Sequence, residues 1–475
     1  MGRADQNNSR VTRADTLMNS RRILIIVLLG LVVRLCLMAL PGTEDMRTNQ
    51  IWGARAVAQG ITQVYIYDDA DYLYKASLAL KHVPVPATAT YYQTQLGPLD
   101  HVPDYPPLSV YTFWLSARAA QAVSGGRLAA GPLLNALFNV LPVLCSLGIL
   151  LLVWQFARRE GLAISPAAVA AFWLNPVLIL HTPVLGYVDA VFALLELGSL
   201  VALFQKKFAW SAALLALAGT TKPQAVLTLP IAALVIWMDG GWRGVVRPAL
   251  IFALTALFTF LPFVATGRFL AALRGAAQVG HVGYLSSQQL NLWWIVTWIY
   301  ESLGRGSGGL VTMLRVEDFP RWFLLDVRLL AMALWAAFIL LILRWLRDEL
   351  REGNRLAIFW AGALQVYGFT MLSLYPKENH LYAFFVCAFS VLLLPRRKVA
   401  ALFAVLSLLF GLNLFLFDGF GRGMSGAAHT LRGALGFDLT ILVAFVNVAV
   451  FVWLMQCRRC LFDQTRATPP SALSA

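Results

Sequence analysis

The stretch GPLLNALFNVLPVLCSLGILLLVWQF, residues 131–156, contains no charged side chain and is followed almost at once by Arg158 and Arg159. About 20 apolar residues in an α-helix span the roughly 30 Å hydrocarbon core of a bilayer. This stretch is long enough to cross, and it ends in a basic pair of the kind that marks the cytoplasmic end of a membrane helix. It therefore predicts a transmembrane helix.

The composition of the whole chain agrees with that prediction. Of its 475 residues, 59% are hydrophobic and only 13% are charged, whereas soluble proteins average about 25% charged residues. The net charge of +14 raises the question of nucleic-acid binding. The basic residues, however, come in pairs between apolar runs, so nucleic acid is not predicted as a partner. The sequence predicts an all-α, multi-pass integral membrane protein.

Apolar runs of membrane length recur through the chain. They cover about 22–40, 131–156, 163–183, 186–204, 208–220, 224–238, 246–265, 323–343, 356–374, 381–394, 399–416 and 437–456. With the basic segment 1–21 in the cytoplasm, the turns on that side hold the basic pairs, as the positive-inside rule requires. About twelve spans in a transmembrane domain at 22–456, followed by a cytoplasmic tail at 457–475, fit this pattern.

Two long loops, at 41–130 and 266–322, then face the extracytoplasmic side. Residues 47–59 and 108–123 are interpreted as amphipathic helices at the membrane interface, and the second loop is expected to carry such a helix as well. The alternative, in which 108–123 crosses the membrane, stays open. It would move every later basic pair to the outer face, which the positive-inside rule disfavours.

The first loop contains acids at two notable positions. Glu44 and Asp45 directly follow the end of the first apolar run, and Asp104 opens the motif DYPPL at 104–108. A carboxylate at the mouth of a bilayer is costly unless it is hydrated, paired or used. Structural roles are open, because Asp45 suits the N-cap of the helix at 47–59 and Asp104 suits the cap of the helix after the prolines. The functional alternative is chemistry on a lipid that carries a polar head.

The order of residues around these acids resembles that of a known family. An acid, a tryptophan seven residues later, a glycine, a tyrosine and a DYPPL motif occur in turn at Asp45, Trp52, Gly60, Tyr65 and 104–108. Here the chain resembles the GT-C membrane glycosyltransferases. The closest likeness is to glycosyltransferase family 57, the dolichyl-phosphate-glucose-dependent glucosyltransferases. The resemblance covers 45–115 and implies a GT-C fold, Asp45 as the catalytic base, and a metal-independent reaction that needs no cofactor.

Basic residues on the outer side are candidates for binding phosphate. Lys222 breaks the positive-inside trend, so either a phosphate or snorkelling to the headgroups must compensate its charge. The turn from Tyr375 to His380 resembles in position the His-Glu-containing motif that contacts the donor phosphate in many GT-C enzymes. Lys377 stands where the histidine is usual, and His380 comes three residues later, so either could stabilise a leaving phosphate. Candidates for contacting the acceptor are Asp104, Glu44 and Asp189.

Taken together, these residues predict an inverting transfer of a hexose from a polyprenyl-phosphate-linked sugar donor. The acceptor is expected to be a hydroxyl of a glycan or glycolipid, such as a lipid-linked oligosaccharide. Asp45 would remove the acceptor proton. Nucleotide sugars are normally unavailable outside the cytoplasm, and no Gly-rich phosphate loop occurs in the chain. The expected location is the plasma membrane of a bacterium or the endoplasmic reticulum of a eukaryote, with an extracytoplasmic active site.

Two other functions stay open. A GT-C-type polysaccharide polymerase or ligase would have arginine-rich outer loops, and candidates for these are Arg268, Arg274, Arg305, Arg315 and Arg321. A lipid or sugar transporter or flippase would place its polar residues near the bilayer midplane, often within internal repeats. The acidic stretch at 68–71 could offer oxygen ligands to a divalent metal, although a hydrated loop explains it more simply. No metal site is predicted.

Overall fold

The computed structural model describes residues 2–66, 102–126, 128–162, 164–278, 283–305, 309–320, 326–392 and 397–457. Within these ranges the chain forms helices joined by turns, with isolated β-bridges and no strand. The all-α prediction is therefore confirmed for the described residues. The acidic stretch at 68–71 and the tail from residue 458 onward lie outside them.

Six of the described helices are long and apolar enough to cross a membrane: Pro132–Arg159, Pro166–Val184, Pro223–Ala265, Val327–Arg351, Ala400–Asp418 and Leu439–Gln456. Two shorter apolar helices cover Phe208–Thr221 and Ala357–Leu372. The chain is thus a helical protein of membrane type, as its composition predicts. The number of about twelve spans stays a prediction.

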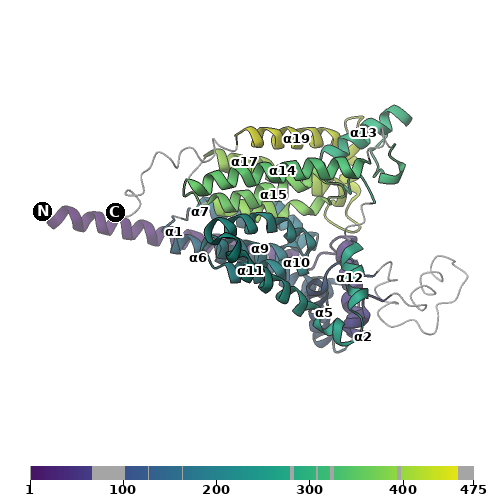
Figure 1. Ribbon diagram of the computed structural model, residues 1–475, viewed down its shortest axis with the longest axis horizontal. Coiled ribbons are helices and arrows are strands. Elements are labelled where there is room, and N and C mark those ends of the chain that lie inside the picture. The colour runs from purple at the N-terminus through teal and green to yellow at the C-terminus, as the bar shows by residue number, and fades with distance from the viewer. Residues whose placement is uncertain are drawn as a thin grey trace, which may run out of the picture. The chain divides into compact units, whose positions relative to one another are not determined.

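The chain separates into two compact units. Unit 1 comprises Met1–His281 together with Phe420–Gly423, and unit 2 comprises Val282–Gly419 together with Met424–Ala475. Most of unit 1 is coloured purple to teal in Figure 1, and unit 2 is green to yellow.

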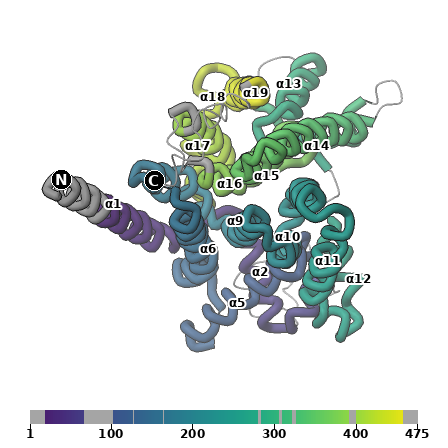
Figure 2. Tube along the Cα trace, turned by 60° about the vertical axis from the view of Figure 1, so that its left-hand side comes forward, coloured from purple at the N-terminus to yellow at the C-terminus, as the bar shows by residue number. Residues whose placement is uncertain are grey.

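The first half of unit 1 contains α1 (Gly2–Leu37), α2 (Glu44–Gln59), η1 (Ile61–Gln63), α5 (Pro107–Val123), α6 (Pro132–Arg159), α7 (Pro166–Trp173), α8 (Pro176–Ile179) and the π-helical η2 (Leu180–Val184). The second half contains α9 (Asp189–Phe204), α10 (Phe208–Thr221), η3 (Pro223–Thr228), α11 (Leu229–Ala265) and α12 (Phe269–Gln278). Helix α10 packs between α9 and α11, and α2 packs on α5, which in turn packs on α6 (Figure 2).

Proline and glycine set several of these boundaries. Proline occupies the first turn of α5, α6, α7 and α8, where the missing N–H has no intrahelical partner to lose. Within α11, Gly241 has a φ of +61° and interrupts the helix. The apolar runs predicted at 224–238 and 246–265 therefore meet at a kink in one long helical segment.

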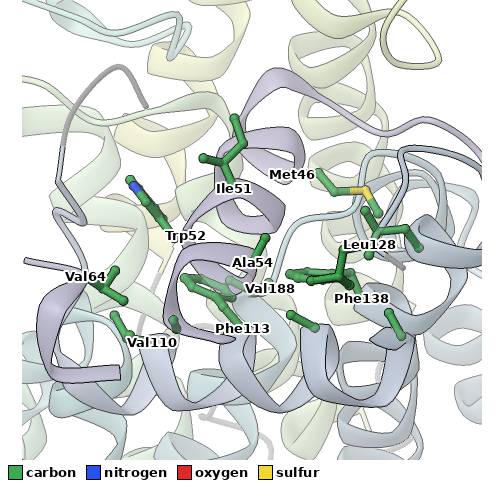
Figure 3. Packing of buried hydrophobic residues seen from close by; sticks show 14 of the residues in the cluster. Met46, Ile51, Trp52, Ala54, Val64, Val110, Phe113, Leu128, Phe138 and Val188 are labelled. Atoms are coloured by element: carbon green, nitrogen blue, oxygen red, sulfur yellow. The ribbon is translucent and has the colours of Figure 1, made fainter. Parts of the chain in front are cut away.

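A buried cluster joins α2 to α5 and α6 (Figure 3). The Trp52 ring lies 6.1 Å from the ring of Phe113 between centroids. The backbones of α2 and α5 approach closely at Gly53, because a Cβ there would lie 2.5 Å from the Phe113 carbonyl oxygen. The helices predicted at 47–59 and 108–123 are thus confirmed as helices and are packed on each other. Whether α5 lies at the interface or crosses the membrane stays a prediction.

Unit 2 contains α13 (Leu292–Arg305), η4 (Val316–Asp318), α14 (Val327–Arg351), α15 (Ala357–Leu372), η5 (Glu378–Leu381), α16 (Tyr382–Leu392), α17 (Arg397–Asp418), α18 (Gly426–Gly433) and α19 (Leu439–Cys457). Helix α15 is almost completely buried and packs against α14 and α16. Gly368 of α15 meets the Phe338 ring so closely that a Cβ would lie 2.0 Å from it. This unit positions the loop between α15 and α16, where Lys377 and His380 lie.

An ion pair in unit 2 holds the start of α19. Arg432 donates from Nε to both carboxylate oxygens of Asp438 at 3.0 Å, and from Nη2 to the Val311 carbonyl. The Asp438 carboxylate also accepts the backbone N–H of Val311 at 2.7 Å and that of Thr440 at 3.0 Å. The Thr440 hydroxyl donates to it at 2.7 Å and accepts the Trp294 indole N–H at 2.9 Å. Every polar contact of this carboxylate is satisfied within unit 2.

Candidate functional site

Thr43 fixes the turn that carries Glu44 and Asp45. Thr43 is the N-cap of α2, and its hydroxyl oxygen accepts the Met46 N–H at 3.3 Å. The Thr43 N–H and hydroxyl both donate to the Leu185 carbonyl, at 2.9 and 3.2 Å. The alternative in which Asp45 caps this helix is therefore wrong, because the helix begins three residues earlier than predicted and Thr43 caps it.

Both acids consequently lie in the first turn of α2, where exposed N–H groups make negative charge favourable. Glu44 is exposed and forms a long ion pair with Arg47 at 3.9 Å, a contact that contributes little at a surface. Asp45 is partly buried. Seven residues are about two helical turns, so Asp45 and Trp52 project from the same side of α2. The spacing that underlies the family resemblance thus aligns the acid with the tryptophan.

Two glycines shape this turn around one methionine. Gly42 and Gly186 have φ values of +66° and +76°, which favour glycine. A Cβ on either residue would lie 2.3 Å from the Met46 sulfur. Side chains larger than hydrogen are therefore excluded at both positions unless Met46 moves.

Helix α6 anchors the end of the first membrane run. The Asn139 amide donates to the Met38 carbonyl at 2.9 Å, and the Asn135 amide donates to the Ala39 carbonyl at 3.2 Å. The Asn135 oxygen in turn accepts the Gln50 amide of α2 at 2.9 Å. Two asparagines, one helical turn apart on α6, thus hold both the segment before the turn and the helix after it.

Arg422 holds the same turn from a segment far along the chain. Its backbone N–H donates to the Gly42 carbonyl at 2.7 Å, while its side-chain Nη2 and Nε donate to the Pro41 carbonyl at 3.0 and 3.3 Å. Sequence analysis did not single out this residue. The available signal was an arginine between two glycines, Gly421 and Gly423, in the stretch between the predicted apolar runs at 399–416 and 437–456.

The DYPPL motif contacts the tryptophan of α2. The Tyr105 ring meets the Trp52 ring edge-on, with centroids 6.0 Å apart. The Tyr105 carbonyl accepts the Tyr65 hydroxyl at 2.6 Å. Burial raises the pKa of Tyr65 well above its usual range, and the neighbouring Tyr111 and Asp104 raise it further, so the phenol stays protonated and donates. The structure therefore brings together three residues that carry the family resemblance.

Asp104 is partly buried and is not the cap of α5. Pro106 holds that position without a side-chain hydrogen bond, and Pro107 opens the helix. The predicted alternative of a capping role for Asp104 is therefore wrong. Helix α12, in the second long loop, closes against the same region, because a Cβ on Gly275 would lie 2.6 Å from the Tyr65 ring and 2.7 Å from the Pro103 carbonyl oxygen.

The structure pairs Asp189 with Lys222. The Lys222 ammonium donates to Asp189 Oδ1, and His181 Nε2 lies 3.5 Å from Asp189 Oδ2. All three side chains are buried. The charge of Lys222, which sequence analysis matched to a phosphate or to snorkelling, thus has an anionic protein partner. Next to this pair, the Ser109 hydroxyl of α5 donates to the Thr221 carbonyl at 2.7 Å.

Lys377 and His380 belong to unit 2 and lie on one turn. The Lys377 backbone N–H donates to His380 Nδ1 at 3.2 Å, so the neutral imidazole carries its proton on Nε2. The turn is held by a hydrogen bond from the Ser287 N–H to the Pro376 carbonyl at 3.2 Å. Tyr375 has a φ of +64°, a strained backbone conformation for a non-glycine residue that is common at functional sites.

No protein-family model matches the chain, and no curated protein is a significant match. The resemblance to GT-C glycosyltransferases therefore rests on the motif residues, above all Asp45, Trp52, Tyr65 and 104–108. Of these, Trp52, Tyr65 and Tyr105 are in contact in unit 1.

Proposed function

We propose that this protein is an inverting glycosyltransferase that takes a hexose from a polyprenyl-phosphate-linked donor and transfers it to an acceptor hydroxyl at the extracytoplasmic membrane surface. The observation that supports this best is the construction of the turn before α2. A carboxylate, Asp45, follows the first apolar run and is released from capping by Thr43. Hydrogen bonds from α6 and from Arg422 fix the backbone that carries it.

The reaction needs one proton acceptor and one cationic group. Asp45 accepts the proton of the acceptor hydroxyl as the new bond forms between that oxygen and the anomeric carbon. The bond from the anomeric carbon to the phosphate oxygen breaks on the opposite side, and the phosphate leaves with the electron pair. A rigid backbone that positions the base raises the rate of transfer, because a small displacement of a catalytic group lowers that rate strongly.

The other candidate residues are proposed to bind the donor or the acceptor, or to hold the fold. Lys377 and His380 of unit 2 are proposed to bind the leaving phosphate, since a His380 ring with its proton on Nε2 is a hydrogen-bond donor. Glu44 and Asp104 are proposed to contact the acceptor. Lys222 and Asp189 neutralise each other, so we assign this pair chiefly to holding the ends of α9 and α10 together.

One observation favours a transporter as the second candidate. Asp189, Lys222 and His181 are buried charged or titratable groups between apolar helices, and such groups often mark ion or proton pathways. A transporter would move a lipid-linked sugar across the bilayer without forming a glycosidic bond. Product analysis therefore separates the two candidates.

The test is transfer by the purified protein in lipid nanodiscs. Polyprenyl-phosphate-glucose and polyprenyl-phosphate-mannose are offered with a membrane glycan extract, in parallel with the matching nucleotide sugars and no lipid carrier. We expect new glycosidic linkages, detected by mass spectrometry, with a lipid-linked donor alone. Transfer from nucleotide sugars without a lipid carrier, or movement of the donor across vesicles with no transfer, would contradict the proposal.

A further inference from the structure

Arg422 forms a clasp on the backbone just before Asp45. Three of its N–H groups donate to two successive carbonyls, those of Pro41 and Gly42. The approach is as close as a backbone allows, because a Cβ on Gly421 would lie 2.6 Å from the Gly42 carbonyl oxygen. A guanidinium is thereby fixed in place next to the turn that carries the proposed base.

The clasp leaves the charge of Arg422 uncompensated. Its side-chain acceptor, the Pro41 carbonyl, is a neutral group that cannot cancel a positive charge. Glu44 is near enough to affect Arg422 electrostatically, yet among the described residues no carboxylate forms an ion pair with it, and Nη1 has no hydrogen bond. Because the side chain is only partly buried, this edge of the guanidinium is accessible to a ligand.

Two other cations of unit 1 have carboxylate partners, by contrast. Lys222 is paired with Asp189, and Arg47 faces Glu44 at 3.9 Å. In unit 2, the Arg432 guanidinium donates hydrogen bonds to the Asp438 carboxylate. A fixed arginine whose carboxylate partner is missing suits an incoming phosphate, because the planar guanidinium matches phosphate oxygens and keeps its charge at any physiological pH.

We infer that Arg422 binds the phosphate of the lipid-linked donor. This inference rests on the proposed function. Pro41 and Gly42 precede Asp45 by four and three residues. In an inverting displacement the entering and leaving oxygens lie on opposite sides of the anomeric carbon, so the phosphate-binding cation must be near the base without contacting it. Arg422 binds the backbone at Pro41 and Gly42, close to Asp45, without contacting Asp45. Its positive charge stabilises the negative charge that develops on the phosphate.

A purely structural clasp is the competing explanation, and variants of two neighbouring residues separate the two. Gly421→Ala disturbs the clasp and keeps the charge, whereas Arg422→Gln removes the charge and keeps N–H donors for the Pro41 carbonyl. Arg422→Lys retains a charge without the planar fork. Arg118→Gln removes an exposed cation of α5 that contacts Gln121 at 3.1 Å, and it serves as the control for a general loss of positive charge.

The first measurement is steady-state kinetics with the donor that supports transfer. For Arg422→Gln we expect the donor KM to rise about 10- to 100-fold, as is typical for loss of a hydrogen bond to a charged group, with the acceptor KM unchanged. Arg422→Lys is expected to fall between the wild type and Arg422→Gln. Gly421→Ala should lower kcat and leave the donor KM near that of the wild type. A donor KM that stays at the wild-type value in Arg422→Gln would overturn the inference.

The second measurement needs no turnover. Binding of polyprenyl phosphate and of the matching polyprenol is compared by tryptophan fluorescence in nanodiscs. The wild type and Arg118→Gln are expected to prefer the phosphate over the alcohol, and Arg422→Gln is expected to lose most of that preference. Equal preference in wild type and Arg422→Gln would overturn the role of Arg422 even if transfer is observed. Absence of transfer by the wild type, with the phosphate preference intact and dependent on Arg422, would instead count against the proposed function alone.

Discussion

Two aspartates at helix starts, Asp45 in unit 1 and Asp438 in unit 2, differ in what they contribute to the start of their helices. Asp438 precedes α19, accepts the Thr440 N–H there, and is further held by Arg432 and Val311. Asp45 stands in the first turn of α2, where Thr43 already performs the capping. Asp438 thus caps its own helix, whereas in α2 the cap is Thr43 and Asp45 lies two residues further on. An acid near a helix start where another residue provides the cap is therefore the better candidate for chemistry.

The buried pair of Asp189 and Lys222 can be compared with the pair of Asp438 and Arg432. Like Asp438, Asp189 is buried against a cation. Its second oxygen, however, lies 3.5 Å from His181 Nε2, which is longer than an ordinary hydrogen bond. A buried ion pair contributes most when its remaining hydrogen-bonding capacity is satisfied, so we expect Asp438 to be the stronger structural pair.

The largest expected effect is on activity, and it distinguishes Asp45 from Asp438. Asp45→Asn should lower kcat for glycosyl transfer by about 10²- to 10⁴-fold, the usual loss for a general base. Stability should be nearly unchanged, because the Thr43 cap remains. The measurements are transfer rates and thermal unfolding in nanodiscs.

A matched control is the same substitution at a capping carboxylate outside the proposed site. Asp326 is the N-cap of α14 and accepts the Arg328 N–H at 2.9 Å. Asp326→Asn should leave both activity and stability close to those of the wild type, since asparagine caps as well as aspartate. If Asp45→Asn behaves like Asp326→Asn, the proposed base is not Asp45.

The second effect concerns stability. Asp438→Ala leaves Arg432 buried without its partner, which typically costs about 3–5 kcal/mol of unfolding free energy. The kcat of the remaining folded protein should not change. Denaturation titrations measure the loss, and a double variant, Arg432→Met with Asp438→Leu, should recover much of it. Failure of the double variant to recover stability would show that the hydrogen bonds to Val311 and Thr440 matter more than the ion pair.

The smallest effect is a dependence of stability on pH. Burial alone raises the pKa of the Asp438 carboxyl, but hydrogen bonds from Arg432 and Thr440 outweigh it and hold the pKa below its usual value. The carboxylate therefore stabilises the fold above the ordinary aspartate pKa of about 3.9, and this contribution is lost as pH falls through the lowered value. Below about pH 4 the melting temperature of the wild type should approach that of Asp438→Asn. A constant gap between the two down to pH 2 would contradict this.

Local pattern was enough for the helices but not for the contacts between them. The uncharged run at 131–156 predicts the helix that the structure shows at Pro132–Arg159, and the mixed pattern at 108–123 predicts α5. The sequence predicts the start of α2 three residues too late, because threonine, glutamate and aspartate in succession all suit the beginning of a helix.

The pairings in the candidate site depend on residues far apart in sequence. Lys222 and Asp189 are 33 residues apart, on the ends of two helices. A charge that breaks the positive-inside rule indicates that a partner exists, yet it does not say whether that partner is a side chain or a ligand. The contact of Arg422 with Pro41 spans 381 residues, and no periodicity within a window of the chain reports such a contact.

That separation also sets an order of events during biosynthesis. The first loop leaves the ribosome early, but the arginine that clasps Pro41 is 381 residues further along. At a synthesis rate of about 5–20 residues per second, the turn waits roughly 20–80 s for its clasp. The proposed base therefore acquires its final setting only when the last helices are being inserted, and a chain that stops before Gly421 carries every acid of the first loop on an unclasped turn.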